Sequence, residues 1–145
     1  MKLDVTAELD GFYADACVSA SVGRPRSGTA RLAETARRAL ADAIGVARAG
    51  APLNAIGAAV EQTVIRRGHT VCTDLMGHGI GRRIHEPPQV PNHFVPRLSQ
   101  VLTDGLVLTI EPIISAGAGA VRETGDGWTV RTADGSVSAH VEPRS

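Results

Sequence analysis

The most constraining feature of the sequence is the segment of residues 73–90, in which glycines and prolines flank two histidines. His78 lies between two glycines, and the pair His85-Glu86 is followed by two prolines. Glycine allows an ion, a ligand or another strand to approach the backbone closely, whereas proline favours an extended conformation in the residue before it. A single loop histidine is more often a surface or hydrogen-bonded residue than a ligand. The segment therefore predicts a metal or substrate site only where carboxylates from elsewhere join it.

Two such carboxylates are expected in a β-hairpin over residues 2–22. Apolar residues alternate on both sides of Asp10-Gly11, which is a strong two-residue turn signal. With this turn, the numbers of paired residues sum to 21, so Asp4 and Asp15 become diagonal neighbours on one face. Such neighbours lie roughly 7–8 Å apart, which is close enough for both carboxylates to reach one or two metal ions. The alternative interpretation is two strand aspartates that face water.

Two helices are predicted to follow the hairpin. Residues 29–49 carry an apolar stripe at helical spacing, and Gly50 is expected to end this helix. Residues 54–67 form the second helix, with Asn54 as its N-cap and Gly68 as its stop. Both helices are interpreted as scaffold, because the charged residues of the first helix lie off the apolar stripe.

Two further carboxylates are predicted to lie in strands. Residues 106–114 resemble a buried strand that contains Glu111, and a buried carboxylate is costly unless it is paired or bound to a metal. Residues 128–132 and 137–142 are expected to pair as a last hairpin about an Asp-Gly turn, with Glu142 at its far end.

Four carboxylates and one imidazole thus form the candidate set: Asp4, Asp15, His78, Glu111 and Glu142. So many charges at one buried site need cations, and the set suits two divalent ions with bridging carboxylates. Hard ligands of this kind favour Mn, Fe or Co over a thiolate-type zinc site, and Zn is a further candidate. Two such ions can share a water molecule, convert it to hydroxide near neutral pH and polarise a carbonyl oxygen. The set therefore predicts hydrolytic chemistry.

Composition and charge narrow the class of protein. The 145 residues fit one domain, and the 15 basic and 15 acidic side chains give no electrostatic reason to expect nucleic acid or a membrane surface as partner. We see no secretion signal and no apolar run near the ~18 residues that a bilayer span needs. Cys17 and Cys72 are interpreted as reduced, buried thiols of a cytoplasmic protein.

Five motifs appear in order: Leu-Asp4-Val-Thr, Asp10-Gly-Phe-Tyr-Ala-Asp15, Gly77-His78-Gly-Ile-Gly with His85-Glu-Pro, Thr109-Ile-Glu111-Pro and Ser138-Ala-His-Val-Glu142. Together they resemble the bacterial-type methionine aminopeptidases, which are pita-bread metallopeptidases of family M24. The resemblance runs along essentially the whole chain. It implies an α+β fold, with a curved, mostly antiparallel sheet and two helices on its outer face. Prolidases and proline aminopeptidases share this family, so a proline-specific peptidase is the second enzymatic alternative.

The resemblance also implies a role for each matching position. The five metal ligands of the family fall on Asp4, Asp15, His78, Glu111 and Glu142, with Asp15 and Glu142 in the bridging places. Glu111 also matches the general base that takes the proton of the metal-bound water. His85 matches the histidine that contacts the scissile region of the substrate and stabilises the tetrahedral intermediate. Trp128 matches a tryptophan near the methionine pocket; a buried core tryptophan is the alternative.

Two departures from the family pattern bear on the predicted function. Family members carry roughly 80–100 further residues before the Asp4 strand. They also continue past the Glu142 position into a closing strand, whereas here Pro143-Arg-Ser follows. We therefore expect a single domain over residues 1–145 that is truncated in its N-terminal half and at its C-terminal strand. The Asp4 strand is expected to be an uncovered edge.

The predicted function is hydrolytic removal of N-terminal methionine from peptides and nascent proteins. The alternatives are a catalytically impaired module that binds metal or protein, and a fragment of a longer enzyme whose start site is misassigned. In either of these cases a second chain or a missing N-terminal segment would complete the cleft. The intact ligand set argues against a module that binds only proteins, because aligned charges are costly to retain without a cation.

Overall fold

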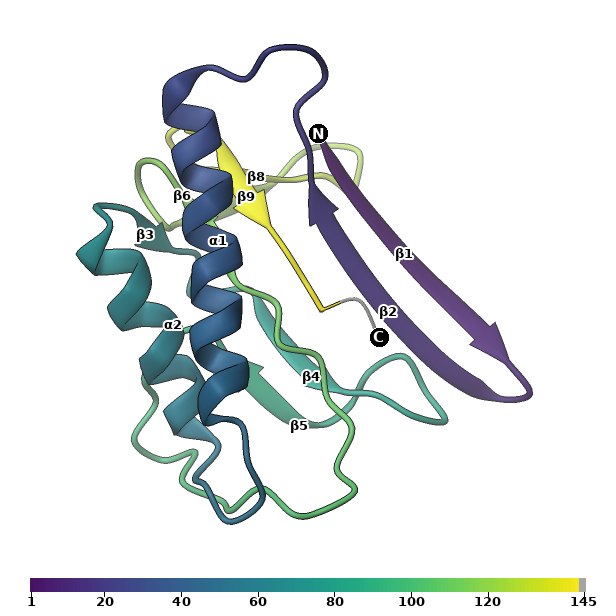
Figure 1. Cartoon of the computed structure of the whole chain (residues 1–145). Helices are drawn as coiled ribbons and strands as arrows, with labels where there is room; N and C mark the ends of the chain where they lie inside the picture. Colours follow the sequence, from purple (N-terminus) through teal and green to yellow (C-terminus); the bar gives the residue numbers. More distant parts are fainter. Residues whose placement is uncertain (144–145) are drawn as a thin grey trace.

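The structure is a computed structural model, and it describes residues 1–143. Figure 1 shows two helices side by side over a group of short strands, with one long hairpin at the edge of the molecule. The hairpin consists of β1 (Lys2–Leu9) and β2 (Phe12–Ser19), which pair antiparallel. No helix among the described residues is both long and apolar enough to cross a bilayer.

The register of the hairpin confirms the prediction, since Asp4 pairs with Cys17 and Thr6 pairs with Asp15. The turn residue Asp10 has a φ of 53°, and the glycine after it has a φ of 78°. Two consecutive positive φ angles match the right-handed twist of the flanking strands, which is why an Asp-Gly pair fixes the register. Within residues 1–143, β1 pairs with β2 alone and is exposed along its whole length.

The helices are α1 (Ser27–Val46) and α2 (Asn54–Arg66), and they pack against each other. Their facing residues are small or branched and fully buried, namely Leu32, Ala36, Ala39 and Ala43 from α1 and Ile56, Val60 and Val64 from α2. The first helix ends three residues before the predicted boundary, and Gly50 lies in the turn that follows. Gly68 adopts a φ of 75° just after α2, as a helix stop requires.

The predicted N-cap of α2 was wrong. Leu53 occupies the cap position, and its backbone already has helical angles, so Asn54 is the first helical residue. The Asn54 amide instead donates to the carbonyls of Val95 and Pro96. Its side chain therefore connects the start of the helix to the loop that follows β5 (Glu86–Pro91).

The remaining strands are short and antiparallel. A three-stranded sheet has the order β3 (Thr70–Val71), β6 (Ile113–Ser115) and β9 (Ser138–His140). Two further pairs are formed by β4 (Met76–Gly79) with β5, and by β7 (Val121–Glu123) with β8 (Val130–Thr132).

The buried strand predicted over residues 106–114 is much shorter in the structure. Only its last two residues belong to β6, and Leu106 and Val107 are exposed. The part from Thr109 to Glu111 is buried but does not form a regular ladder, and Pro112 has no N–H to donate. The Thr109 N–H donates to the His78 carbonyl over 2.7 Å instead, so this segment is tied to β4.

The last predicted hairpin was also wrong in its pairing. The Asp134-Gly135 turn exists, but β8 before it pairs with β7 and β9 after it pairs with β6. Asp126 forms the turn between β7 and β8 by accepting the N–H groups of Trp128 and Thr129. The apolar face of β9 is buried in the core, which fixes its place beside β6.

Both cysteines are reduced and buried, as expected. Burial raises the pKa of the Cys17 thiol to about 12, with a further increase from nearby Asp4, and burial raises the pKa of the Cys72 thiol to about 11. We expect neither thiol to react with an aromatic disulfide reagent in the folded chain at neutral pH, because the reactive species is the thiolate. The absorbance of the aromatic thiolate that the reagent releases should rise only after guanidinium is added. Rapid labelling of the folded chain would contradict this prediction.

Candidate metal centre

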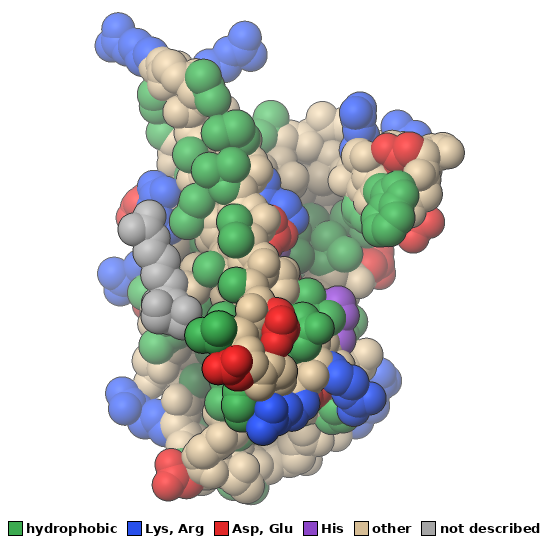
Figure 2. All heavy atoms as spheres, turned by 90° about the vertical axis from the view of Figure 1, so that its right-hand side faces the viewer, with side chains coloured by type: hydrophobic (Ala, Val, Ile, Leu, Met, Phe, Trp, Pro, Cys, Tyr) green, Lys and Arg blue, Asp and Glu red, His purple; other side chains and the backbone are tan. Residues whose placement is uncertain are grey.

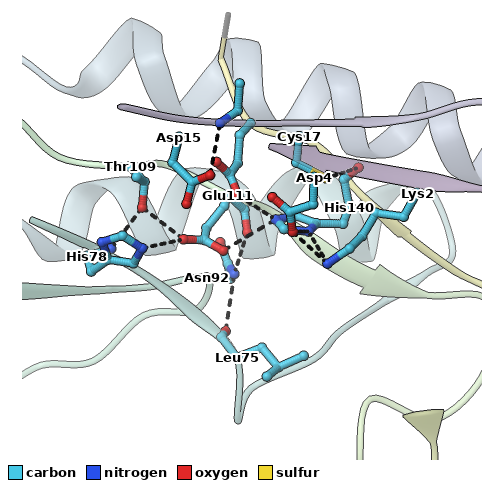
Figure 3. A network of polar contacts seen from close by, with 12 residues as sticks. Lys2, Asp4, Asp15, Cys17, Leu75, His78, Asn92, Thr109, Glu111 and His140 are labelled. Carbon is cyan, nitrogen blue, oxygen red and sulfur yellow. Dashed lines mark hydrogen bonds and ion pairs between the residues drawn. The ribbon is translucent and has the colours of Figure 1, made fainter. Parts of the chain in front are cut away.

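The hairpin and three segments far from it in the sequence, which carry His78, Glu111 and Glu142, converge on one region. Figure 3 shows Asp4 from β1, Asp15 from β2 and His78 from β4 around the buried Glu111. Oxygen atoms of Asp4, Asp15 and Glu142 lie within 4.8 Å of one another. The structure therefore brings together all the carboxylates that the sequence singled out, while their role as ligands stays a prediction.

The hairpin fixes its two aspartates in different ways. The Thr6 hydroxyl donates to Asp15 Oδ1 over 3.0 Å, and the N–H of Ala16 donates to the same oxygen over 3.1 Å. Within residues 1–143, the second oxygen of Asp15 makes no hydrogen bond. The Lys2 ammonium pairs with Asp4 Oδ2 over 2.8 Å and neutralises part of its charge.

Glu111 is held at both its side chain and its backbone. The Thr109 hydroxyl accepts the His78 N–H over 3.0 Å and donates to Glu111 Oε1 over 2.8 Å. His78 Nε2 lies 3.5 Å from that same oxygen. The Asn92 amide donates to the Glu111 carbonyl over 2.9 Å and to the Leu75 carbonyl over 3.2 Å. The carboxylate and the imidazole are therefore oriented by neighbours that the sequence analysis did not single out.

His140 is the residue of this site that sequence reasoning missed. It is buried, and its Nε2 lies 3.1 Å from Glu142 Oε1 and 3.3 Å from Glu111 Oε2. Its Nδ1 faces the Lys2 ammonium at 3.2 Å. A usable signal was its spacing, because residues two apart in an extended chain point to the same face and Glu142 follows two positions later.

The electrostatics of the centre favour a bound cation. Burial raises the pKa of Glu142, and the nearby charges of Glu111 and Asp15 raise it further, although His140 opposes them. Among residues 1–143, Glu142 Oε2 is buried without a hydrogen bond, and His140 Nε2 makes none of good geometry although carboxylate oxygens of Glu111 and Glu142 lie close to it. Buried polar atoms normally have a hydrogen-bond partner, so buried atoms without one are candidate contacts for a bound ion or water molecule. Carboxylates and imidazoles that converge in this way suit a divalent cation.

His85 lies at the edge of this centre. Its ring meets the His78 ring edge to face, with 4.3 Å between the centroids. Both histidines line a cavity of about 370 Å³, together with Met76, Glu86, Pro87 and Gln89. The cavity therefore opens next to the proposed ligands.

The glycines around His78 allow a close approach, as predicted, and the approaching group is protein backbone. A Cβ at Gly77 would lie 2.4 Å from the Thr109 carbonyl oxygen, and a Cβ at Gly79 would lie 2.2 Å from that of Pro87. The register of β4 and β5 also shifts at His78 and Gly79. Any side chain at these glycines would displace the segments that position His78.

The family follows from comparison with known proteins. The profile of metallopeptidase family M24 matches residues 1–137. The chain belongs to metallopeptidase family M24. Family membership implies divalent metal ions, and the donor set of this M24 chain fits them.

Several similar proteins carry the name methionine aminopeptidase. The chain is 39% identical over 142 residues to the enzyme of Escherichia coli, covering 98% of this chain and 54% of that protein. It is 38% identical over 143 residues to methionine aminopeptidase 2 of Bacillus subtilis, covering 98% of this chain and 57% of that protein. The M24 chain thus spans about half the length of the curated relatives it matches.

Solved structures confirm the fold. The methionine aminopeptidase of Thermotoga maritima superposes with a TM-score of 0.94 at 39% identity, covering 97% of this chain and 57% of that one. A prolidase from Pyrococcus furiosus superposes with a TM-score of 0.72 at 21% identity, covering 97% of this chain and 36% of that one, which shows the shared fold alone. The M24 chain therefore has the predicted α+β architecture and corresponds to part of the pita-bread fold.

Trp128 lies in the turn between β7 and β8 with 89% of its surface exposed. The alternative of a buried core tryptophan was wrong, because the side chain is exposed in a turn that Asp126 stabilises. A substrate-binding role for Trp128 in this M24 chain stays a prediction.

We expect the metal-free M24 chain to lose stability as the pH rises above about 6.5. Burial would lower the pKa of His140, but the carboxylates of Glu111 and Glu142 outweigh it and raise this pKa above its ordinary 6.5. The folded state then holds the proton more tightly than the unfolded state, so the stabilisation is complete below pH 6.5 and is lost through the raised pKa. The raised pKa of Glu142 acts in the same direction, because its protonated form is favoured in the folded state.

Melting temperatures in chelator, measured by circular dichroism across this pH range, check the expectation. The His140→Gln variant should show a weaker dependence on pH. A melting temperature that rises with pH in the unaltered chain would contradict the assignment of charge in this cluster.

Proposed function

We propose that this chain carries the hydrolytic centre of a methionine aminopeptidase. The observation that carries the proposal is the convergence of four carboxylates and two imidazoles in one largely buried cluster. The identity to methionine aminopeptidases over nearly the whole chain supports the same activity. The proposed centre holds two divalent ions, Mn, Fe or Co, with Zn as a further candidate. Their proposed ligands are Asp4, Asp15, His78, Glu111 and Glu142.

The bound ions would supply a water molecule acidic enough to lose a proton near neutral pH and would polarise the scissile carbonyl. Residues of the chain would carry out the proton transfer and stabilise the developing negative charge. Glu111 would take the proton, because Thr109 holds one of its oxygens and leaves the other directed into the cluster. His85, at the wall of the adjacent cavity, would donate a hydrogen bond to the oxygen that becomes negative during attack.

The proposed substrate is the N-terminal methionine of a peptide or nascent protein with a small second residue. The cavity beside His78 and His85 lies next to the proposed ligands, so a peptide N-terminus bound there would reach them. Nascent chains with this terminus are made in the cytoplasm, and we place the activity there.

The deciding experiment combines metal content with hydrolysis on this chain. Mn or Co is titrated into the metal-free protein, bound metal is counted by mass spectrometry, and cleavage of the peptide Met-Ala-Ser is followed by chromatography. We expect about two ions per chain and release of methionine, with Glu111→Gln retaining the fold and losing the hydrolysis. Metal binding without hydrolysis would favour the catalytically impaired module. Absence of metal binding would overturn the proposal.

A further inference from the structure

The start of α1 gathers positive charge. Within residues 1–143, Arg26 at its N-cap position makes no capping hydrogen bond through its side chain, and the first turn contains no acidic residue. The first N–H groups of a helix have no partner within the helix, and they form the positive end of its dipole. Figure 2 shows Lys and Arg side chains extending from the top of the molecule, the end at which α1 begins in Figure 1. A helix start of this kind favours a bound anion.

A cavity of about 380 Å³ opens at this helix start. Gly28 and Thr29 of the first turn line the cavity, together with Arg26 and Arg31. A Cβ added at Gly28 would meet no atom within 4 Å among residues 1–143, so a ligand can approach the backbone there. Within the same residues, neither arginine forms an ion pair. Both guanidinium groups therefore lack an anionic partner, and guanidinium is the side-chain group that best matches phosphate or carboxylate oxygens.

His69 is the buried member of the cavity wall. It exposes 8% of its surface, and its Nδ1 is buried without a hydrogen-bond partner within residues 1–143. Burial lowers the pKa of His69, and the charges of Arg31 and Arg67 lower it further. The imidazole is therefore neutral at neutral pH and has one N–H group to donate. Since buried polar atoms normally have a partner, His69 is a second and independent indication of a ligand in this cavity.

We propose that this cavity, formed by the start of α1 with Arg26, Arg31 and His69, binds a phosphate group. The ligand is inorganic phosphate or the phosphate of a small organic monoester, because its negative charge and several acceptor oxygens suit a wall of N–H donors. No acidic residue among residues 1–143 lines the cavity to repel it. The lining residues include none of the proposed metal ligands, so this inference is independent of the hydrolytic function proposed above.

Isothermal titration calorimetry of the chain with inorganic phosphate tests the proposal. We expect saturable binding that Arg31→Gln weakens about tenfold, because one charged hydrogen-bond donor is lost. The matched control is Arg48→Gln, which removes an unpaired charge beyond the other end of α1 and should leave the affinity unchanged. Phosphate held by metal ions at the other centre would bind Arg31→Gln and the unaltered chain equally. Such equal binding, equal weakening in both variants or no saturable binding overturns the proposal.

NMR spectroscopy of the histidine rings tests whether the anion reaches His69. The His69→Phe variant identifies the His69 signal among the five histidines of the chain. Saturating phosphate should raise the pKa of His69, because a bound anion favours the charged imidazolium. A pKa of His69 that phosphate leaves unchanged places the anion elsewhere and overturns the site. The same titration with glycerol 3-phosphate distinguishes the sources: tighter binding than inorganic phosphate identifies an organic monoester as the ligand, and weaker or equal binding identifies free phosphate.

Discussion

Replacing Glu142 with glutamine is expected to abolish the rise in melting temperature that Mn or Co produces in the unaltered chain. The carboxylate of Glu142 belongs to two groups of closely spaced donors, one with Asp4 and Asp15 and one with Glu111 and His140. Metal at a hundred times its dissociation constant stabilises a protein by about 2.7 kcal/mol. For a domain of this size that amounts to a shift of about 10 °C. Differential scanning fluorimetry with and without metal measures this shift in melting temperature.

Without metal, the same Glu142→Gln substitution should stabilise the chain. Burial and neighbouring carboxylates disfavour the charged form of Glu142, so the neutral amide should raise the melting temperature of the metal-free chain. Glu123→Gln is the matched control, because this carboxylate is exposed on β7. It should change neither value. A full metal-dependent shift in Glu142→Gln would remove this residue from the ligand set.

The second large effect is expected for Gly57→Ala, which should destabilise the chain by about 3 kcal/mol or more. A Cβ at this position would lie 2.1 Å from the His93 carbonyl oxygen and 2.8 Å from that of Pro91. Backbone on both sides prevents an easy adjustment, so α2 must move away from the end of β5. Since β5 pairs with β4, the displacement should also reach His78. Chemical denaturation gives the change in the free energy of unfolding.

A matched alanine substitution should have the opposite sign. Gly45 lies near the end of α1, and within residues 1–143 no atom would lie within 4 Å of its added Cβ. Alanine is the better helix former by up to about 1 kcal/mol, so Gly45→Ala should be neutral or stabilising. If both variants were equally destabilised, the contact at Gly57 would not be the cause.

The parts of the fold that could be predicted from the sequence depend on local rules. The Asp10-Gly11 turn fixes a two-residue connection, and the pairing of Asp4 and Asp15 follows from it by counting. The partner strands of β8 and of β9 could not be derived in this way. An Asp-Gly turn reverses the chain at residue 135, but which strand lies beside β9 depends on burial of its apolar face in a core made by distant segments.

The residues of the candidate site also differ in whether the local sequence could identify them. Glu111 was recognisable because a single acid in an apolar segment needs a partner wherever the segment lies. Thr109 and Asn92 carry no such local signal, because each is an ordinary polar residue until the chain brings it to Glu111. The signal for His140 was only its spacing of two residues from Glu142. The predicted N-cap at Asn54 failed for a similar reason, since a loop some forty residues later offers its amide better acceptors.

The way the hairpin joins the rest of the molecule has a consequence for local unfolding. Away from its own strands, the hairpin donates the Tyr13 N–H to the Gly81 carbonyl and accepts the Glu142 N–H at the Cys17 carbonyl, and the Ser19 hydroxyl exchanges hydrogen bonds with the His140 backbone. Arg82 also contacts the tip of the hairpin. With few such links, the hairpin can open without unfolding the helices. An ion shared by Asp15 and Glu111 would close a chain loop of roughly 100 residues, as a cross-link does. Metal occupancy would then appear as slower hydrogen exchange at the Tyr13 amide, although this residue takes no part in binding the ion.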